Sequence, residues 1–428
     1  MTAPRRRILF LTPQLPYPPH QGTAIRNWHL IQHVAQQHQV DVLSFAARPQ
    51  ADVAAAEPLR ALVNRLAVVP PPSRTLPRRL ADLLRGRADM TQRLASREFV
   101  DTLAAWLAHG YDVVQAEGIE MAPYLLHIRD WRSVKNQQRS TDDWTATGAP
   151  GRRLVYDAHN AEALLQQRNC LTDLRRPRRW VAALYSLVQW QRLARVEANL
   201  ARRVDRVIAV SDADAAALRR LAPGVQPLVV PNGVDTGFYD PSQPAAHLPI
   251  VLSAPLELTQ PLLVFTGKLD YRPNIEACLW LVREVMPRLW AERPTVHVAL
   301  VGRDPAPAVQ ALAAPRVTVT GWVPDTRPYM ARATVFVAPL RVGGGTRLKL
   351  LEALAMGCPI VSTPQGAEGL DLEDAALLAD DPDSFARSTS ELIQDEARRG
   401  ALSQAARRLA LARYDWRAIL PRLDPVYV

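Results

Sequence analysis

A glycine-rich segment in the second half of the chain carries the residue types of an anion site. Residues 343–345 are three consecutive glycines, and Thr346, Arg347 and Lys349 follow at the start of a helical pattern. Glycines let backbone N–H groups approach a ligand, and a helix N-terminus favours anions. The helix dipole disfavours basic side chains at that end, so their presence suggests that a phosphate is bound there. The pattern therefore predicts a phosphate site, with Thr346 as the helix cap.

Glu352 adds a carboxylate to this predicted site. It lies three residues after Lys349 and therefore on the same face of the helix. A carboxylate there can accept hydrogen bonds from vicinal sugar hydroxyls, which points to a ligand that carries both a phosphate and a sugar. The alternative interpretation is a glycine-rich turn before a surface helix with an ordinary Lys–Glu pair.

A second group of polar side chains follows a predicted strand in the first half. Residues 156–162 read Tyr-Asp-Ala-His-Asn-Ala-Glu, and His159 or Asn160 can contact a sugar from such a strand end. Glu117, which follows an earlier predicted strand, is an alternative residue for this site. The plain structural interpretation is that His159 is a packing or exposed residue.

The sequence lacks the usual patterns of a metal site or a nucleoside-triphosphate site. It contains no His-Glu-x-x-His, no Cys/His cluster and no Walker motif. Asp212 and Asp214 form an Asp-x-Asp string, but they follow Ser211 and are typical of the first turn of a helix. We therefore expect neither a metal nor a cofactor.

Short apolar strands separated by helix-length segments must position these residues. Such strands are predicted in the first half at residues 8–11, 40–45, 112–114, 154–157, 207–210 and 228–230, with a helix at 25–38. They are predicted in the second half at residues 262–267, 296–302, 317–321, 335–338 and 360–362. This alternation predicts an α/β protein with two doubly wound parallel sheets, whose ligands bind at the carboxyl ends of the strands.

Proline and small residues dominate residues 240–261, which are typical of a linker. We therefore expect four parts. They are an N-terminal Rossmann-like domain over residues 1–240, a linker over 241–261, a C-terminal Rossmann-like domain over 262–405, and a C-terminal helix over 406–428 that packs back on the first domain.

The basic charge is confined to the first half of the chain. Residues 1–240 hold 32 basic and 22 acidic residues, a net of +10, so the remainder holds 52 − 32 = 20 basic and 42 − 22 = 20 acidic residues. This excess favours an anionic partner for the first half. Only three basic residues are lysines, and two of these, Lys268 and Lys349, lie in motifs of the second half.

Residues 341–363 resemble the signature of retaining GT-B glycosyltransferases of family 4, also called glycosyl transferases group 1. That family has two glutamates eight positions apart, and the second, matched by Glu352, holds the donor ribose. The first would fall at Gly344, so the resemblance leaves the donor sugar undefined. We still expect Gly344 to lie at the donor-binding site. The backbone N–H groups expected to meet the sugar and phosphate belong to Gly345, Thr346 and Arg347.

Other segments extend the resemblance over roughly residues 7–415. Lys268 stands where the family has an arginine that binds the diphosphate. The family's lysine five residues later would fall at Pro273, so we expect Arg347 or Lys349 to replace that cation. Further matching segments are residues 207–211, 230–235, 321–325 and 333–339.

The loop over residues 16–26 resembles the family's glycine-containing loop, which faces the donor phosphates across an interdomain cleft. The resemblance assigns Gly22 and Thr23 to donor binding, with Arg26 as a helper. It implies the GT-B fold of two facing Rossmann-like domains. The predicted catalytic residues are His159, Lys268, Arg347 and Lys349.

The resemblance implies a metal-independent retaining glycosyltransferase. It would move a sugar from a nucleotide diphosphate sugar to a glycan or lipid-linked acceptor, in the synthesis of a surface polysaccharide, an exopolysaccharide or a glycoconjugate. The nucleotide-sugar is a substrate and not a cofactor. The alternatives are an epimerase of nucleotide-sugars and an inactive sugar-nucleotide-binding scaffold. Nucleic-acid binding is not favoured, because the basic half lacks both the interleaving of aromatic with basic residues and any known nucleic-acid-binding module.

Two arginine-rich segments suggest a membrane surface as a partner. Residues 175–206 contain nine arginines, and apolar residues recur there at helical spacing. Residues 74–87 contain five arginines among leucines. We therefore expect a cytoplasmic protein that rests on an anionic inner membrane face. The alternative is a pair of helices packed on the core with solvated basic faces.

Overall fold

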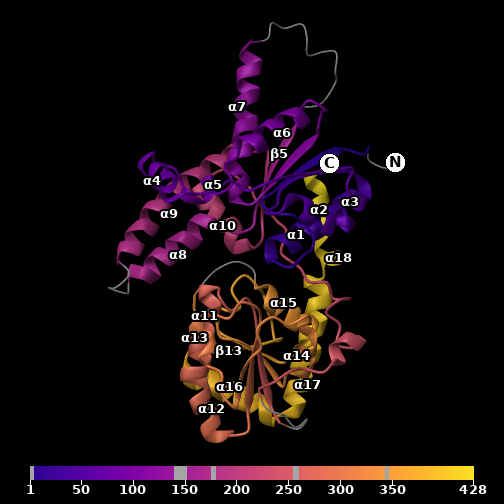
Figure 1. Cartoon of the computed structure of the whole chain (residues 1–428). Coiled ribbons are helices and arrows are strands. Elements are labelled where there is room, and N and C mark those ends of the chain that lie inside the picture. The colour runs from indigo at the N-terminus through magenta and orange to yellow at the C-terminus, as the bar shows by residue number, and fades with distance from the viewer. Residues whose placement is uncertain (1–3, 139–151, 175–179, 254–259, 343–346) are drawn as a thin grey trace. The chain divides into compact units, whose positions relative to one another are not determined.

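The computed structural model describes residues 4–138, 152–174, 180–253, 260–342 and 347–428 (Figure 1). The chain divides into two compact units. Unit 1 contains Met1–Pro231 together with Leu420–Val428, and unit 2 contains Asn232–Ile419. The sequence predicted the first boundary at residue 240, whereas the structure has it at residue 231. Of the predicted C-terminal helix over 406–428, only residues 420–428 belong to unit 1.

Unit 1 is built on a seven-stranded parallel sheet in the order β3-β2-β1-β4-β5-β6-β7. The strands are β1 (Arg7–Thr12), β2 (Gln39–Phe45), β3 (Arg65–Val69), β4 (Val113–Glu117), β5 (Arg153–Ala158), β6 (Arg206–Ala209) and β7 (Leu228–Val229). The order reverses between β1 and β4. In a doubly wound sheet the carboxyl ends of the strands at this point are where ligands bind.

Helices of unit 1 cover this sheet and extend beyond it. They are α1 (Gly22–Gln37), α2 (Pro49–Ala55), α3 (Glu57–Leu62), α4 (Leu76–Leu84), α5 (Asp89–Gln92), α6 (Arg97–Leu107), α7 (Ala122–Gln138), α8 (Glu162–Leu174), α9 (Trp180–Arg203) and α10 (Asp212–Leu221). Ser211 caps α10 by accepting the N–H of Asp214, which confirms that the Asp-x-Asp string begins a helix. Helices α8 and α9 pack along each other as a hairpin (Figure 1).

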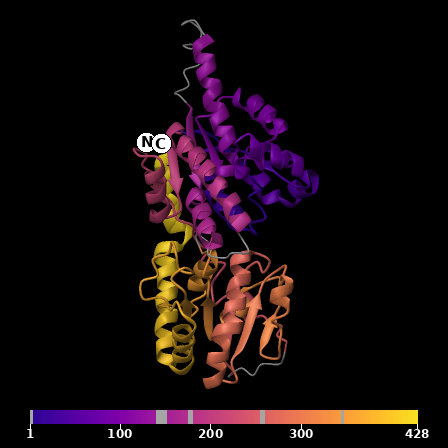
Figure 2. The same cartoon turned by 90° about the vertical axis from the view of Figure 1, so that its left-hand side faces the viewer.

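Unit 2 is built on a six-stranded parallel sheet in the order β10-β9-β8-β11-β12-β13. Its strands are β8 (Leu262–Thr266), β9 (His297–Val301), β10 (Val317–Val319), β11 (Val335–Ala338), β12 (Ile360–Ser362) and β13 (Leu377–Leu378). Its helices are α11 (Arg272–Trp280), α12 (Met286–Glu292), α13 (Pro307–Gln310), α14 (Arg327–Arg332), α15 (Leu348–Ala355), α16 (Pro382–Gln394), α17 (Glu396–Leu409) and α18 (Trp416–Ile419). Figures 1 and 2 show helices on both faces of this sheet.

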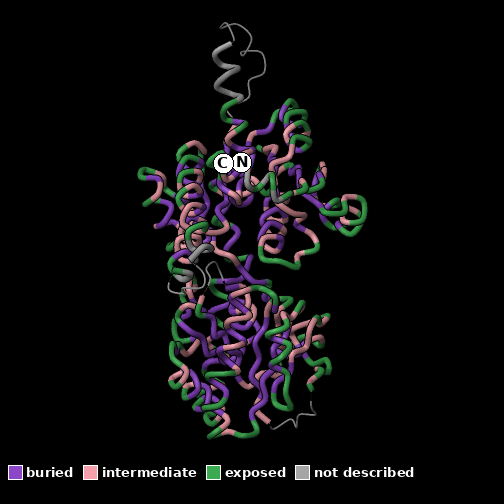
Figure 3. The backbone as a smooth tube through the Cα atoms, turned by 60° about the vertical axis from the view of Figure 1, so that its left-hand side comes forward, coloured by how far each residue is buried: buried purple, intermediate pink, exposed green. Residues whose placement is uncertain are grey.

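The two parallel sheets confirm the prediction of a doubly wound α/β fold. Buried residues concentrate on the strands at the centre of each unit, drawn purple in Figure 3. The sequence missed β3, whose residues are mostly half-buried, and β13, which is two residues long. Across the described ranges, no helix combines the length and the apolar character that a membrane span needs.

Two glycines bring the carboxyl ends of β8 and β9 into contact. A Cβ on Gly302 would lie 1.7 Å from the carbonyl oxygen of Gly267, so position 302 accepts no side chain without a backbone shift. A Cβ on Gly267 would lie 2.9 Å from Nζ of Lys349. The two glycines therefore leave room at this edge of the sheet for the backbone and for a side chain from α15.

Candidate functional site

Lys349 reaches from α15 to the carboxyl end of β8. Its Nζ donates to Oδ1 of Asn274 at 2.8 Å and lies 3.9 Å from the ring centroid of Phe265. The amide nitrogen of Asn274 donates in turn to the carbonyl of Lys268 at 2.8 Å. The structure thus brings together two segments that the sequence assigned to one site, the end of β8 and the start of α15.

Lys349 lies beside the position where the resemblance leaves a cation missing from α11. Asn274 follows Pro273, where the family's second lysine would fall. Lys349 contacts Asn274 from a different helix, so its ammonium group lies beside that position. The geometry supports Lys349 over Arg347 as the replacement cation.

The pKa of Lys349 is lowered to about 7, mainly by burial; the charge of Arg347 also lowers it, whereas Cys278 and Glu352 raise it. Near neutral pH the ammonium group is therefore close to its midpoint. A bound anion favours the charged form of a neighbouring lysine. Binding of a phosphate beside Lys349 would accordingly recruit a proton to it.

Lys268 and Arg347 have different surroundings from Lys349. The side chain of Lys268 is 47% exposed and its Nζ lies 3.0 Å from Oδ2 of Asp270, so it is accessible to a ligand. Arg347 is buried and donates to the carbonyl of Gln365 at 3.0 Å. It occupies the N-cap of α15 in place of the predicted Thr346. Gly344, Gly345 and Thr346 lie outside the described residues.

Glu352 lies one turn further along α15 and has Tyr239 as its hydrogen-bond partner. Burial raises the pKa of the Glu352 carboxyl to about 7, against the opposing effects of Tyr239 and Lys349. A half-buried carboxylate one turn from a cation is a suitable acceptor for two neighbouring hydroxyl groups.

The second group of predicted residues lies in unit 1, at the carboxyl ends of β4 and β5. Glu117 is the last residue of β4 and pairs in register with Asp157 of β5. His159 follows β5, and its Nε2 lies 3.0 Å from Oε2 of Glu117. With the amide of Asn27 oriented so that its nitrogen faces acceptors, Asn27 donates to the same oxygen at 2.9 Å and to the carbonyl of Thr23 at 3.2 Å.

Arg26 has a structural role that the sequence did not predict. It is 1% exposed and donates to both oxygens of Asp157, at 2.9 and 3.0 Å. It also donates to the carbonyl of Val230 at 3.0 Å. Its guanidinium group therefore joins α1, β5 and the end of β7. Gly22 and Thr23 form the first turn of α1, where Gly22 is exposed.

Burial dominates the acid–base properties of this cluster. It raises the pKa of Glu117 to about 7 and that of Asp157 to about 6, although the charge of Arg26 opposes both shifts. Burial also lowers the pKa of His159, against the attraction of Asp157 and Glu120. Burial therefore favours the neutral form of each of these three groups.

The same three side chains, Glu117, Asp157 and His159, are of metal-ligand type, with ligand atoms within 4.8 Å of one another. Both oxygens of Asp157 already accept from Arg26, and those of Glu117 face Gln115 and His159. A guanidinium charge in the cluster repels a second cation. Arg26 therefore already supplies a positive charge to the carboxylates that a metal ion would need.

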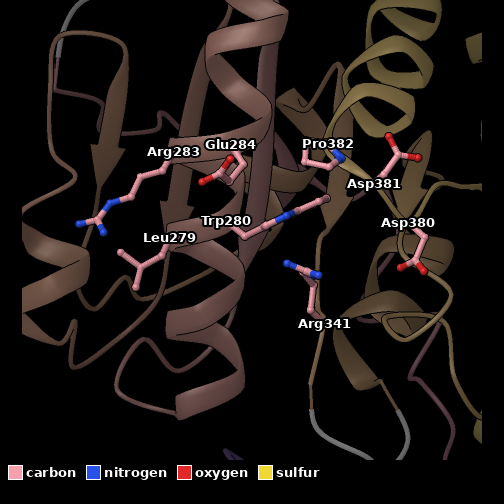
Figure 4. A pocket seen from close by; sticks show the side chains of 8 residues that line it. All are labelled: Leu279, Trp280, Arg283, Glu284, Arg341, Asp380, Asp381 and Pro382. Carbon is pink, nitrogen blue, oxygen red and sulfur yellow. The ribbon is translucent and has the colours of Figure 1, made fainter. Parts of the chain in front are cut away.

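A hollow of about 430 Å³ in unit 2 lies away from the predicted donor residues. Figure 4 shows its lining, with Arg341 directed toward Trp280. Its residues are Leu279, Trp280, Arg283, Glu284, Arg341, Asp380, Asp381 and Pro382. Because acidic and basic groups are mixed in it and none of the predicted site residues lines it, we place the candidate site by its chemistry at α15 and not in this hollow.

Comparison with known proteins identifies the family. The family model described as Glycosyltransferase Family 4 matches residues 21–238, and the one described as Glycosyl transferases group 1 matches residues 260–395. The chain belongs to glycosyltransferase family 4. Each match falls largely within one unit, so both halves of this family 4 chain support the assignment.

Curated relatives of the family 4 chain are distant. It is 25% identical to alpha-maltose-1-phosphate synthase of Mycolicibacterium smegmatis over 57% of its length. It is 27% identical to phosphatidyl-myo-inositol mannosyltransferase of Propionibacterium freudenreichii over 54% of its length. The matches cover 66% and 58% of those proteins, which is less than two thirds of each.

The fold of the family 4 chain is that of GT-B glycosyltransferases. A crystal structure of Anabaena Alr3699/HepE in complex with UDP and glucose superposes with a TM-score of 0.64 at 17% identity, covering 99% of both chains. At this identity the likeness shows the fold alone.

Sequence reasoning missed several residues that hold the predicted ones in place. Lys349 bonds to Asn274, and Glu352 bonds to Tyr239. Glu117 accepts hydrogen bonds from Gln115 and Asn27. Asn27 follows Arg26 directly and Asp157 lies two residues before His159, so the local motifs gave a signal for these two. The other contacts join distant segments, and the sequence carries no local signal for them.

Proposed function

We propose that this family 4 chain is a retaining glycosyltransferase that transfers a sugar from a nucleotide diphosphate sugar to a glycan or lipid-linked acceptor. Its place would be in the synthesis of surface polysaccharide, exopolysaccharide or glycoconjugate. The observation that carries this is the pairing in unit 2 of a half-buried lysine and a carboxylate one turn apart, Lys349 and Glu352, at the carboxyl edge of a doubly wound sheet. This pair matches a donor that joins a diphosphate to a ribose.

In this proposal the cations neutralise the departing diphosphate. Lys349 contacts it from α15 and Lys268 from the end of β8, and the backbone at Arg347 supplies the helix N-terminus. Glu352 accepts hydrogen bonds from the ribose hydroxyls. Fixed cations and a helix dipole then stabilise the leaving group, so the proposed reaction uses neither a metal nor a cofactor.

His159 is the proposed sugar contact of unit 1. Its imidazole, aligned by Glu117, donates to or accepts from a hydroxyl of the donor sugar or the acceptor. The leaving phosphate takes the acceptor proton, so no side chain of the chain is required as the base. This assignment suits a retaining reaction without a covalent intermediate.

A thermal-shift screen with UDP-, GDP-, ADP- and dTDP-sugars tests the donor site, because a ligand that binds the folded state raises its apparent stability. The donor that shifts the melting temperature is then incubated with sugar and lipid-linked acceptors. Product with acceptor attached supports the proposal. An isomerised sugar without acceptor indicates an epimerase, and binding without turnover indicates a scaffold.

Lys349→Arg is expected to lower turnover by at least about tenfold, or about 1.4 kcal/mol of transition-state stabilisation. The ammonium group of Lys349 lies close to both Phe265 and Asn274, and a guanidinium group is larger and planar, so we expect it to place its charge differently. Steady-state kinetics with saturating donor measures the effect.

Lys268→Arg is the matched control for Lys349→Arg, because the side chain of Lys268 is half exposed and leaves room for a guanidinium. Its effect should be smaller. Arg398→Lys, on the surface of α17, should change neither turnover nor melting temperature. Full activity of Lys349→Arg would move the phosphate contact to Lys268 or Arg347.

We also propose that unit 1 rests on an anionic membrane surface through the α8–α9 hairpin. Exposed apolar side chains lie in the last turn of α8 and the second turn of α9. They are Leu171, Leu174, Leu184 and Tyr185, with exposed fractions of 40–63%. Residues 175–179 lie outside the described residues and read Arg-Arg-Pro-Arg-Arg in the sequence. Apolar side chains beside arginines are typical of segments that bind anionic membrane interfaces.

The protein is expected to co-sediment with vesicles that contain anionic lipid and not with neutral ones, and binding should fall as salt rises. Leu171→Ser combined with Leu184→Ser should weaken this binding. Leu378→Ser replaces an equally exposed leucine of unit 2 and should leave binding unchanged. Equal binding to both kinds of vesicle, or binding to neither, would contradict the membrane proposal. An anionic acceptor would then be the expected partner of the basic charge.

A further inference from the structure

Residues 420–428 bring Tyr427 to the back of the cluster around His159. The Tyr427 side chain is buried, and its hydroxyl donates to Oε1 of Gln115 at 2.6 Å. Nε2 of Gln115 donates to Oε1 of Glu117 at 2.7 Å. The other oxygen of Glu117 faces Nε2 of His159 at 3.0 Å. A continuous chain of hydrogen bonds therefore links Tyr427 to His159 within unit 1.

We propose that Tyr427 is a positioning residue for His159, acting through Gln115 and Glu117. The proposal rests on the proposed function, in which His159 contacts the sugar or the acceptor. Tyr427 itself does not touch His159 or a substrate. It acts by fixing the orientation of one buried amide.

The two ends of the Gln115 amide differ in what they can bond to. One end donates and the other accepts, and only the donating end can face the carboxylate of Glu117 favourably. The hydroxyl of Tyr427 occupies the accepting end, and Gln115 is fully buried. Without that hydroxyl the accepting end lacks its donor, and the amide gains freedom to rotate away from Glu117.

The orientation of Gln115 controls the charge state beside His159. A hydrogen bond from Gln115 stabilises the ionised form of Glu117, which in turn accepts Nε2–H of His159. Arg26 and Asp157 face Glu117 from α1 and β5, and Asp157, Arg26 and Glu120 act on His159. These groups stay in place when only the Tyr427 hydroxyl is removed.

Tyr427 also has packing contacts that a purely structural role would explain. Its ring centroid lies 5.9 Å from that of His38, and Arg153 donates to the carbonyl of the preceding Val426 at 2.7 Å. Tyr427→Phe keeps the ring and removes the hydroxyl. This substitution therefore separates the hydrogen-bond chain from the packing.

The test is a pH titration of the full chain labelled with ¹⁵N-histidine, observed by NMR, with the His159 signal assigned from His159→Gln. In Tyr427→Phe the titration midpoint of His159 should fall by at least about 0.5 pH units, because the neighbouring carboxylate is less ionised. The share of the Nδ1–H tautomer should rise. Gln115→Met, which removes the amide, should produce the same two changes.

Tyr124→Phe is the matched control. It removes another buried tyrosine hydroxyl of unit 1, which bonds to the backbone of Leu94 and Ser96. It should leave the His159 titration unchanged. If Tyr427→Phe and Gln115→Met both titrate like the wild type, the positioning role is wrong.

The measurement uses no donor or acceptor, so its outcome is separate from that of the transfer assay. A shifted His159 in a chain without transferase activity would refute the proposed function and retain the coupling. An active chain with an unshifted His159 would do the reverse.

Discussion

His159→Ala is expected to lower kcat by at least about 100-fold, the smaller end of the effect of a positioned acid–base or hydrogen-bonding group. The imidazole lies at the carboxyl edge of the unit 1 sheet, partly exposed and held by Glu117. Removing it deletes the proposed sugar contact and leaves Glu117 without one of its partners. Steady-state kinetics with the donor found in the thermal-shift screen measures the loss.

His127→Ala is the control for this substitution, because His127 is exposed on α7 of the same unit. It should keep full activity. The melting temperature of His159→Ala should stay close to that of the wild type, since the ring is not part of a hydrophobic cluster. A His159→Ala enzyme that keeps half of its kcat would restrict His159 to a packing role.

Glu352→Ala is expected to weaken donor binding by roughly 1.5–3 kcal/mol, the range for a hydrogen bond to a charged group. The carboxyl group faces Tyr239 and lies near Lys349, so its removal deletes the proposed ribose contact without exposing the core of unit 2. Isothermal titration with the donor or its nucleoside diphosphate measures the change. Glu391→Ala, at a surface ion pair of α16, is the control.

The pH dependence of stability gives a second measure of Glu352. Burial raises its pKa in the folded state to about 7, above the ordinary value of 4.5. An acid with a raised pKa binds its proton more tightly when folded, so its contribution to stability is present at low pH and is lost as pH rises from 4.5 through 7. The melting temperature of Glu352→Ala should therefore improve relative to the wild type over that interval. An unchanged difference between the two would show that Glu352 is not buried as described.

Much of the fold could be predicted from sequence because it depends on local patterns. Short apolar strands and helix-length spacers predicted two parallel sheets, and the glycine-rich turn predicted the start of α15. The strand β3 was missed because its half-buried residues give a weak apolar signal. The strand β13 was missed because it is only two residues long and is recognised by its pairing with β12.

The candidate site was predicted residue by residue but not in its connections. Lys349 and Glu352 stand out by type and spacing, whereas their partners Asn274 and Tyr239 depend on which segments the fold brings together. Arg26 shows the same limit in reverse. Its place at the start of a helix after a loop suggested a ligand contact. Its burial against Asp157 depends on how α1 packs on the sheet, for which the sequence carries no local signal.

The return of residues 420–428 to unit 1 has a consequence for the order of biosynthesis. A ribosome that has completed residues 1–231 must still make 419 − 231 = 188 residues of unit 2 before Leu423, Val426 and Tyr427 emerge. At about 5–20 residues per second this interval lasts roughly 10–40 s. Throughout it, the nascent unit 1 lacks the hydroxyl that orients Gln115 and the apolar side chains that fill that part of its core. Unit 1 is translated first, but it therefore cannot complete its native packing until residues 420–428 have been made.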